Sequence, residues 1–404
     1  SNAKPVISFD EEGVCSGCRY SESKTDINWD EKYKILKNIV EVYKEKAKKN
    51  NSPYDCIIPV SGGKDSTFQT YYMMKNFNLN PLLVSFNHTF NTKLGLRNLE
   101  NLLEKSNCDL IRFTTNRKST KKIAKYMLEK LGDVTWHYHA GVNTFPIQIA
   151  VKYKIPLIIW GEMGFSEMAG MFNQDDMIEF TRMLRTEHDM RGFDAEDLLE
   201  SNDNDFTKLD LSGYFYPSDQ EIFDLDLKGI FLSNFIEWNS KQQTELIMKE
   251  WDFNVLEDDR DRTFNKYDKT DDAANGVHDY LKYLKFGYGR ATDDASTEIR
   301  NGRMTREEGI EMVNKHDGKR PRDLDFILDF LEISENYFYK CIDHLRDKNM
   351  WEYKNGVWNK KYNIQDFTSP YIEKVRLPQK NERTYFLKNY KTKKNNFYND
   401  FKII

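Results

Sequence analysis

The sequence predicts an α/β fold, with a parallel sheet in the first part of the chain and a mainly helical region after it. Two observations lead to this prediction. Short runs rich in aliphatic residues, typical of strands buried on both faces, alternate with segments of helical periodicity. The first run leads directly into a glycine-containing loop and then a helix. With 404 residues, of which 39% are hydrophobic, the chain can bury the core that such a fold needs.

The predicted elements follow in the order helix, strand, helix, strand, helix, strand, helix. This alternation is typical of a parallel sheet whose strands are joined by helices. The run 81–86 is almost continuously aliphatic, which favours a strand with helices on both sides. The predicted strands are 56–60, 81–86, 109–113, 155–160 and 229–232. The predicted helices are 29–49, a helix that starts at Thr67, 93–105 and 119–131.

The loop after the first strand has the composition of a phosphate-binding site. Two consecutive glycines allow a tight turn with inward N–H groups, and the positive end of the next helix faces the same pocket. A Walker loop needs four residues between its glycines and a Ser or Thr after its lysine, so this loop is of another kind. A plain glycine turn is the alternative, but the flanking polar residues favour phosphate. The loop residues are Ser61, Gly62, Gly63, Lys64, Asp65 and Ser66.

Two further strand ends are candidates for the same site, because ligands of open parallel sheets bind at the carboxyl ends of strands. Gly161 and Glu162 directly follow the strand 155–160. Glu162 is a candidate catalytic residue, although a carboxylate that stabilises a helix N-terminus is an equal alternative. We place the switch point of the sheet between the first two strands, so the adenine of a nucleotide is expected at the end of the second strand. The residues there are Ser85, Phe86 and Asn87.

The cysteines and histidines offer two candidate metal sites. Cys15 and Cys18 have C-x-x-C spacing, which supplies half of a tetrahedral zinc site, and a pair of free thiols is the alternative. Five cysteines, an odd number, do not describe a disulfide framework. His137 and His139 alternate, so in an extended segment they would face the same side and bind a metal or substrate. A hydrogen-bonded or solvent-facing pair is the favoured reading of these two histidines.

The stretch 285–309 is the most informative part of the C-terminal region. Its glycines break helices that carry several cations, and arginine presents a planar fork that suits phosphate or carboxylate. An ion-paired helical surface is the alternative, because acidic residues are interleaved. The glycine-spaced turn Phe-Gly-Tyr-Gly-Arg favours an anion site. The candidate substrate ligands are Lys285, Arg290, Arg300 and Arg303.

A change of composition suggests where the domains meet. Residues 252–270 are charged and poor in aliphatic residues, so we expect a boundary there. The predicted parts are a cysteine-containing segment (1–28), a nucleotide-binding domain (29–250) and a mainly helical domain with a tail (251–404). We expect short helices of residues 172–225 to lie over the nucleotide site, and helices from 320 to about 351. The Lys- and aromatic-rich tail from residue 359 is expected to be peripheral.

Composition also excludes several classes of function. A net charge of −5 argues against a general nucleic-acid binder, which needs a concentrated basic surface. No apolar run reaches the roughly 18 residues that a membrane span requires. The N-terminal Ser-Asn-Ala resembles a tag-cleavage remnant rather than a signal peptide. We therefore expect a cytoplasmic protein that acts without nucleic acid or membrane.

The string SGGKDS resembles the pyrophosphate loop (PP-loop) of the ATP pyrophosphatases, which split ATP between its α- and β-phosphates. Taken in order, FDEEGVCSGCR, YDCIIPVSGGKDS, IPLIIWGE and KFGYGRATDDASTEIRNGRMTREEG resemble the bacterial N-acetyl sugar amidotransferases, over about residues 7–320. These PP-loop enzymes act in O-antigen and flagellin-glycan synthesis, including pseudaminic-type sugars. The resemblance implies an adenine nucleotide α hydrolase-like, Rossmann-type domain with a mainly helical C-terminal region.

The family resemblance also implies a reaction and its partners. ATP, with Mg²⁺ held by Asp65, adenylates an acetamido group of a nucleotide-linked sugar, and ammonia then gives an acetamidino group with release of AMP. The loop would hold pyrophosphate, and a separate glutaminase subunit supplies the ammonia in some systems. A homodimer is one candidate assembly. The family commonly has an earlier C-x-x-C that this sequence lacks, which leaves the zinc assignment to Cys15 and Cys18 incomplete.

Two other functions compete with this resemblance. PP-loop enzymes also modify tRNA by thiolation or lysidine formation, and a C-x-x-C pair would suit such chemistry. The acidic balance and the lack of a basic stripe count against that function. A nucleotide-binding subunit without catalytic activity is the second alternative, and the intact Lys64–Asp65 pair argues against it.

Overall fold

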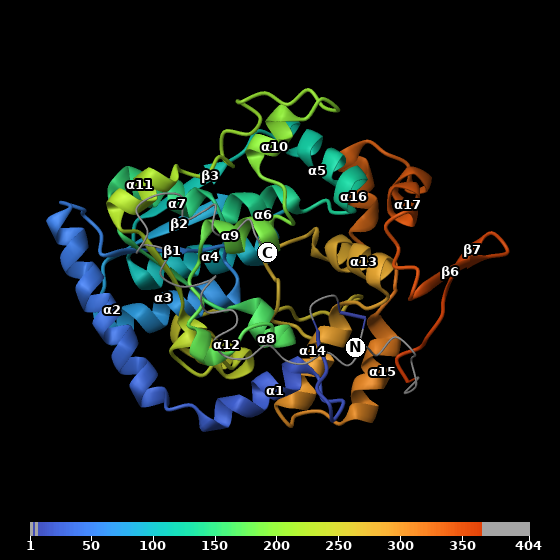
Figure 1. Ribbon diagram of the computed structural model, residues 1–404, viewed down its shortest axis with the longest axis horizontal. Helices are drawn as coiled ribbons and strands as arrows, with labels where there is room; N and C mark the ends of the chain where they lie inside the picture. The colour runs from blue at the N-terminus through green and yellow to red at the C-terminus, as the bar shows by residue number, and fades with distance from the viewer. Residues whose placement is uncertain (1–2, 5–6, 366–404) are drawn as a thin grey trace.

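The computed structural model describes residues 3–4 and 7–365, and it contains a five-stranded parallel sheet with helices on both faces (Figure 1). This confirms the predicted α/β class. The strand order is β3-β2-β1-β4-β5. The order reverses between β1 and β4, so the switch point lies there and not between β1 and β2 as expected from the sequence. The strands are β1 (Cys56–Pro59), β2 (Pro81–Asn87), β3 (Leu110–Thr114), β4 (Leu157–Trp160) and β5 (Lys228–Phe231).

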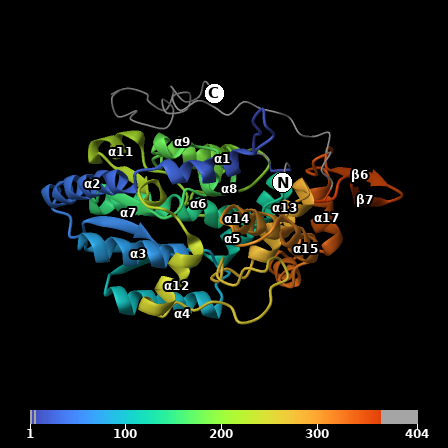
Figure 2. The ribbon, with the colours of Figure 1, turned by 90° about the horizontal axis from the view of Figure 1, so that it is seen from below.

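The two faces of the sheet bury different cores, because alternate residues of a strand point to opposite sides. Ile57 of β1 and Ile158 of β4 belong to one core, with the helices α5, α6 and α7. Cys56 and Ile58 belong to the other, with α2, α3, α4 and α12. Residues of β1, β2 and β4 are mostly buried on both faces, which explains why these strands read as continuous aliphatic runs. The edge strand β3 is only partly buried. Figure 2 shows these helical layers from a second direction.

The helices of the sheet-containing part agree well with the periodicity of the sequence. The helix predicted at 29–49 is α2, and its Asn28 cap accepts a hydrogen bond from the backbone N–H of Glu31. The helices are α1 (Ser16–Ser23), α2 (Trp29–Lys49), α3 (Lys64–Phe77), α4 (Lys93–Ser106), α5 (Arg117–Leu131), α6 (Trp136–Val142), α7 (Phe145–Tyr153), α8 (Gly164–Ala169), α9 (Arg182–Leu184), α10 (Ala195–Glu200), α11 (Asp219–Leu225) and α12 (Ser240–Trp251). Short 3-10 or π segments are η1 (Lys24–Asp26), η2 (Gln174–Asp176), η3 (Arg185–Asp189) and η4 (Leu232–Asn234).

The segment 252–274, where the domain boundary is predicted, runs back along the sheet-containing part. Asn254 N–H donates to the Asn98 side chain of α4 (2.8 Å), and Ala273 N–H donates to the Phe90 carbonyl (2.8 Å). These bonds hold the segment against the carboxyl-end rim of the sheet. The domain boundary itself stays a prediction.

The C-terminal part consists of helices and one hairpin that projects from the molecule (Figure 1). Its helices are α13 (Asn275–Phe286), α14 (Arg290–Arg300), α15 (Arg306–His316), α16 (Leu324–Leu331) and α17 (Glu335–Asp343). The antiparallel hairpin of β6 (Trp351–Lys354) and β7 (Val357–Lys360) was not predicted. Asn355 and Gly356 both have positive φ in its two-residue turn, the conformation that an Asn-Gly pair favours. The predicted peripheral tail lies mostly in 366–404, outside the described residues.

No helix among the described residues is long and apolar enough to cross a membrane.

Candidate functional site

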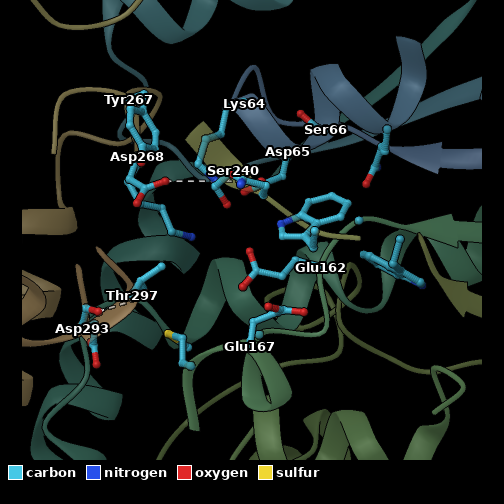
Figure 3. A pocket seen from close by; sticks show the side chains of 18 of the residues that line it. Lys64, Asp65, Ser66, Glu162, Glu167, Ser240, Tyr267, Asp268, Asp293 and Thr297 are labelled. Carbon is cyan, nitrogen blue, oxygen red and sulfur yellow. Dashed lines mark hydrogen bonds and ion pairs between the residues drawn. The ribbon is translucent and has the colours of Figure 1, made fainter. Parts of the chain in front are cut away.

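A large cavity lies at the carboxyl ends of the central strands, where open parallel sheets bind their ligands. Its volume of about 970 Å³ is at the upper end of the range for small-molecule sites. Val60, His88 and Gly161, which directly follow β1, β2 and β4, line this cavity. The facing wall comes from residues between Asn265 and Arg303, and residues of 20–29 and 237–240 also line the cavity, so stretches far apart in the sequence enclose one space (Figure 3).

The loop between β1 and α3 forms one end of the cavity. Gly62 has a φ of +93°, and a side chain there would run into the carbonyl oxygen of Gly95 in α4. Glycine is therefore needed at this position for two reasons. Gly63 N–H donates to Ser61 Oγ (3.2 Å), which closes the turn. Since the 14-residue helix α3 begins at Lys64, its first N–H groups lack helical partners and lie at the cavity.

Lys64 and Asp65 extend from this loop into the cavity (Figure 3). The Lys64 side chain is 7% exposed, and its Nζ lies 2.6 Å from Asp65 Oδ1 and 3.0 Å from Asp268 Oδ1. Burial alone would lower the pKa of Lys64, but the two carboxylates outweigh it and raise that pKa above its usual value. Lys64 is thus a fixed cation that the protein has placed between two acids.

Asp268 had no local motif that marked it in the sequence. It belongs to the segment 252–270, where the density of charge indicated a boundary rather than a site. Burial would raise the pKa of Asp268, but Lys64 and then Arg290 hold it below its usual value. A cluster of acids in a loop poor in aliphatic residues is the signal that could have indicated a site here.

Glu162 reaches the same end of the cavity from the end of β4 (Figure 3). Enclosure in the cavity raises the pKa of Glu162 to about 8, the nearby Asp65 charge adds to this effect, and Lys64 only partly opposes it. A carboxyl group with a pKa near neutrality can accept or donate a proton at physiological pH.

Acidic groups dominate this part of the cavity. Asp294 of α14 also lines it; burial first and Asp268 next raise the pKa of Asp294 to about 7, although Thr263 donates a hydrogen bond to it. More carboxylate side chains than lysine and arginine side chains line the cavity. A divalent cation with oxygen ligands would relieve this excess, and carboxylates such as Asp65 are the ligands that Mg²⁺ prefers.

A further part of the cavity wall comes from α1, η1 and α8. Lys24 Nζ lies 2.6 Å from Glu167 Oε2, and Tyr20 OH donates to Glu167 Oε1 (3.1 Å). All three residues line the cavity. None was predicted, because they are joined only by the packing of α1 on α8.

Several buried polar atoms of the cavity wall lack protein partners among the described residues. They are both ring nitrogens of His88 and the indole Nε1 atoms of Trp160 and Trp238. Buried polar groups are nearly always hydrogen-bonded, so these atoms indicate a ligand or water that the protein alone does not supply. His88 is 6% exposed and directly follows β2.

The segment expected to hold adenine is divided between the cavity and the sheet. Phe86 lines the cavity, whereas Ser85 and Asn87 are not among its lining residues. Asn87 Nδ2 instead donates to Thr114 Oγ1 of β3 (3.0 Å). Adenine binding by these three residues stays a prediction, and His88 is the polar neighbour that does face the cavity.

The four cations predicted at 285–303 have different surroundings. Lys285 is not among the cavity-lining residues; its Nζ donates to the Leu131 carbonyl (2.9 Å), and burial lowers its pKa to about 8. Arg290 lines the cavity and pairs with Asp279 (3.3 Å). The structure therefore places Lys285 in the packing between α5 and α13, away from the other members of the block.

Arg300 and Arg303 also line the cavity. Arg300 donates to the carbonyl oxygens of Glu167 (3.1 Å) and Met168 (3.3 Å), and thereby joins α14 to α8. Arg303 donates to both carboxylate oxygens of Glu298 (2.7 and 2.6 Å). Such contacts are expected of an ion-paired helical surface, which is the alternative to an anion site. Both arginines nevertheless lie in the wall of the cavity.

Cys15 and Cys18 lie at the start of α1, with their sulfur atoms 3.5 Å apart and half-buried. They are not among the cavity-lining residues. A hydrogen bond from Cys18 lowers the pKa of Cys15 to about 5, against the effect of burial. The pair is close enough for a shared metal ion, and it offers two of the four sulfur or nitrogen ligands that a structural zinc site needs.

Two neighbouring segments differ from the arrangements that the sequence suggested. His137 and His139 do not lie in an extended segment but on the helix α6, so they point in different directions. His137 is buried beside the His88 carbonyl (3.4 Å), whereas His139 approaches Thr135 (3.4 Å) and the cavity. Burial lowers the pKa of His139 to about 3, so its ring is neutral.

Residues 172–225 form short helices as expected, but none of the cavity-lining residues comes from them. Their aromatic side chains, such as Phe206 and Tyr214, are buried in the core on the α5–α7 face of the sheet. This core explains the aromatic content that had suggested a cover for the nucleotide site.

Residues 261–365 match the family model described as "LPS biosynthesis protein WbpG-like, C-terminal domain". We call residues 261–365 the WbpG-like region. They are similar to the C-terminal domain of proteins described as acting in lipopolysaccharide (LPS) biosynthesis. The WbpG-like region includes Asp268 and the helix α14, so it contributes the cavity wall that faces the β1–α3 loop. The PP-loop assignment and the amidotransferase reaction stay predictions.

A second similarity is to the uncharacterized protein MJ1599 of Methanocaldococcus jannaschii, which is 28% identical over 111 residues. The match covers 28% of the length of this chain and 38% of the length of that protein. The chain therefore spans well under two-thirds of the length of this relative. No activity is transferred from it.

Proposed function

We propose that this protein is an ATP-dependent N-acetyl sugar amidotransferase of the PP-loop type, which acts in LPS O-antigen or flagellin-glycan synthesis. The observation that supports it best is the shared cavity: the Lys64–Asp65 loop forms one end, and the WbpG-like region forms the facing wall. An anion-binding loop opposite a wall from an LPS-biosynthesis family suits an enzyme that joins a nucleotide to a sugar substrate.

The fold supports binding of ATP at this loop. The strand order β3-β2-β1-β4-β5 is that of doubly wound, Rossmann-type sheets, which bind nucleotides at the switch point. The β1–α3 loop lies beside this point, and the N-terminus of α3 can hold phosphate. Asp65 would hold Mg²⁺, which when bound neutralises phosphate charge.

The reaction follows from the weakness of an amide as an electrophile. The acetamido oxygen attacks the α-phosphorus of ATP, the bond to the β-phosphate oxygen breaks, and pyrophosphate leaves. Ammonia then adds to the activated carbon, a proton is lost, and AMP departs to leave an acetamidino group. No protein nucleophile is required. Lys64 and the first N–H groups of α3 stabilise the departing pyrophosphate.

Glu162 is our candidate for the group that takes the proton from the attacking ammonia. Its raised pKa, about 8, makes the carboxylate a stronger base than an ordinary glutamate. The group lies in the same end of the cavity as Asp65, where the α-phosphate of a loop-bound ATP would be.

The nucleotide sugar would bind against the WbpG-like wall. Its phosphates require cations other than Lys64, and Arg303, Arg300 and Arg290 line that wall. ATP and nucleotide sugars are cytoplasmic substrates, so we place the enzyme in the cytoplasm, with ammonia supplied by a separate glutaminase subunit.

The experiment is to incubate the protein with ATP, Mg²⁺, an ammonium salt and a panel of nucleotide-linked N-acetyl sugars, and to analyse the products by mass spectrometry. We expect AMP, pyrophosphate and a sugar product whose mass corresponds to replacement of an amide oxygen by NH. The matched control is Asp65→Asn. Release of ADP, or AMP formation that depends on added tRNA and not on any sugar, would contradict the proposal.

A further inference from the structure

A second group of polar side chains lies where α6 meets α13, and it is not used in the proposed reaction. Asp133, His139 and His278 each offer one ligand atom, and these atoms all lie within 4.8 Å of one another. Asp133 follows α5, His139 is on α6, and His278 is on the first turn of α13 in the WbpG-like region. Three donors from separate elements thus converge.

A fourth possible ligand, the Thr135 hydroxyl oxygen, lies between these three groups. Thr135 Oγ1 is 2.6 Å from Asp133 Oδ1, 2.8 Å from His278 Nδ1 and 3.4 Å from His139 Nδ1. His278 Nδ1 is 3.7 Å from Asp133 Oδ1. Neighbouring ligands of a tetrahedral ion with bonds of about 2.0–2.1 Å are about 3.4 Å apart. The observed separations lie on both sides of this value, so small side-chain rotations would give a tetrahedral set.

The surroundings hold the carboxylate in place. The Asp133 side chain is 3% exposed, and its Oδ2 lies 2.8 Å from Arg191 Nη1 while Oδ1 accepts from Thr135 N–H (2.8 Å). Outer partners of this kind orient a metal ligand. The His278 side chain is 21% exposed, which gives an ion a path from solvent.

We propose that Asp133, His139 and His278, with the Thr135 hydroxyl, bind a divalent transition-metal ion of the zinc type. Two imidazoles and one carboxylate suit Zn²⁺ or Co²⁺, and not the Mg²⁺ that ATP requires. Because His278 belongs to the WbpG-like region and the other ligands follow α5, the ion joins the two parts of the chain. His139 lines the cavity, so the ion also fixes part of the cavity wall.

A hydrogen-bond network without an ion is the alternative arrangement. The Thr135 hydroxyl would donate to Asp133 and accept from both imidazoles, which would satisfy all four groups. Metal content distinguishes the two, because the network binds no ion and the proposed site binds one per chain.

The test compares four forms of the full chain, each dialysed against Zn²⁺, passed over a desalting column and analysed by mass spectrometry for metals. The double variant His139→Gln/His278→Gln should hold about one equivalent less Zn²⁺ than the unmodified protein. Cys15→Ser/Cys18→Ser should retain that equivalent, which separates this site from the thiol pair. His344→Gln, an exposed histidine on the C-terminal side of α17, is the matched control.

Co²⁺ substitution provides a second readout, in which the proposed ligands themselves are unchanged. The Cys15→Ser/Cys18→Ser protein should show the intense visible bands of tetrahedral Co²⁺ without a thiolate charge-transfer band. Equal Zn²⁺ content in the unmodified and histidine-variant proteins would overturn the proposal. So would the absence of tetrahedral Co²⁺ bands in the cysteine variant, which would indicate the hydrogen-bond network.

Discussion

Asp65 combines an exposed position with a charge that the proposed reaction needs. Its side chain is 40% exposed in the cavity, so Asp65→Asn should leave the core and the fold intact. Loss of one contact that is made in the transition state typically lowers the rate by a factor on the order of 10²–10³. We expect the rate of ATP cleavage by Asp65→Asn to fall by about this factor. Pyrophosphate release measures this, with Asp205→Asn, at an exposed position, as the control. Unchanged turnover in Asp65→Asn would remove the loop from the active site.

Glu162 predicts a pH dependence with a definite sign. A base must be deprotonated, and the pKa of Glu162 is raised to about 8. Amidine formation should therefore increase with pH up to about 8 and then level off. Free ammonia also increases with pH, so the rate of the unmodified protein is divided by that of Glu162→Gln in the same buffers. A ratio that stays constant from pH 6 to about 9 would exclude Glu162 as the base.

At the residue scale, the sequence predicted the chemical type of the site residues better than it predicted which side chains surround them. The loop residues Ser61, Lys64 and Asp65 do line a cavity, because a short motif brings its own geometry with it. Asp268 was missed because its partner Lys64 is about 200 residues away, and no local pattern records such a pair. Lys285 lies outside the cavity lining for the same reason: only the packing of α13 on α5 directs its ammonium group to the Leu131 carbonyl.

At the scale of elements, the β1–α3 loop offers a test of its conformation. Gly62 and Gly302 both have positive φ, but only Gly62 would place a side chain against a backbone carbonyl, whereas a side chain at Gly302 meets nothing within 4 Å. Gly302→Ala should cost about 1–2 kcal/mol of unfolding free energy from the left-handed conformation alone. Gly62→Ala should cost roughly 1–3 kcal/mol more because of the clash. Chemical denaturation of both variants measures the difference, and equal losses would contradict the close approach of α4.

The strands were predictable and the region around α6 was not, for physical reasons. Strands buried on both faces must be almost continuously aliphatic, so the five runs were evident in the sequence. The stretch from Trp136 to His139 alternates aromatic and polar residues like a strand, but burial of Trp136 and His137 in the core overrides that pattern. The hairpin β6–β7 had a usable signal, the Asn355-Gly356 pair between aromatic residues, which sequence reasoning did not use.

At the scale of the whole molecule, the cavity exists only because the WbpG-like region folds back over the rim of the sheet. Thr92 N–H donates to the Asp271 carbonyl (3.1 Å) and Arg300 binds α8, so the contacts lie on both sides of the cavity. The sheet part carries the β1–α3 loop with Lys64 and Asp65, and the C-terminal part carries the arginines. This division predicts that the two substrates depend on different parts of the chain.

Arg303 tests this division. It lines the WbpG-like wall and pairs with Glu298, and a lost charge-assisted contact typically costs about 1.5–3 kcal/mol. Arg303→Ala should therefore weaken nucleotide-sugar binding roughly ten- to a hundredfold in calorimetry and leave ATP affinity almost unchanged. Arg320→Ala, which breaks a pair of exposed ion pairs to Asp325 and Glu335, is the matched control and should change neither.

Removal of Arg303 also leaves the Glu298 carboxylate unpaired beside an anionic ligand, and this repulsion alone could weaken binding. The double variant Arg303→Ala/Glu298→Gln separates the two effects, because it lacks both the cation and the unpaired acid. If Arg303 contacts the nucleotide sugar, the double variant should bind as weakly as Arg303→Ala. Recovery of normal affinity in the double variant, or loss of ATP binding in either, would show that this pair only stabilises the wall and does not recognise the substrate.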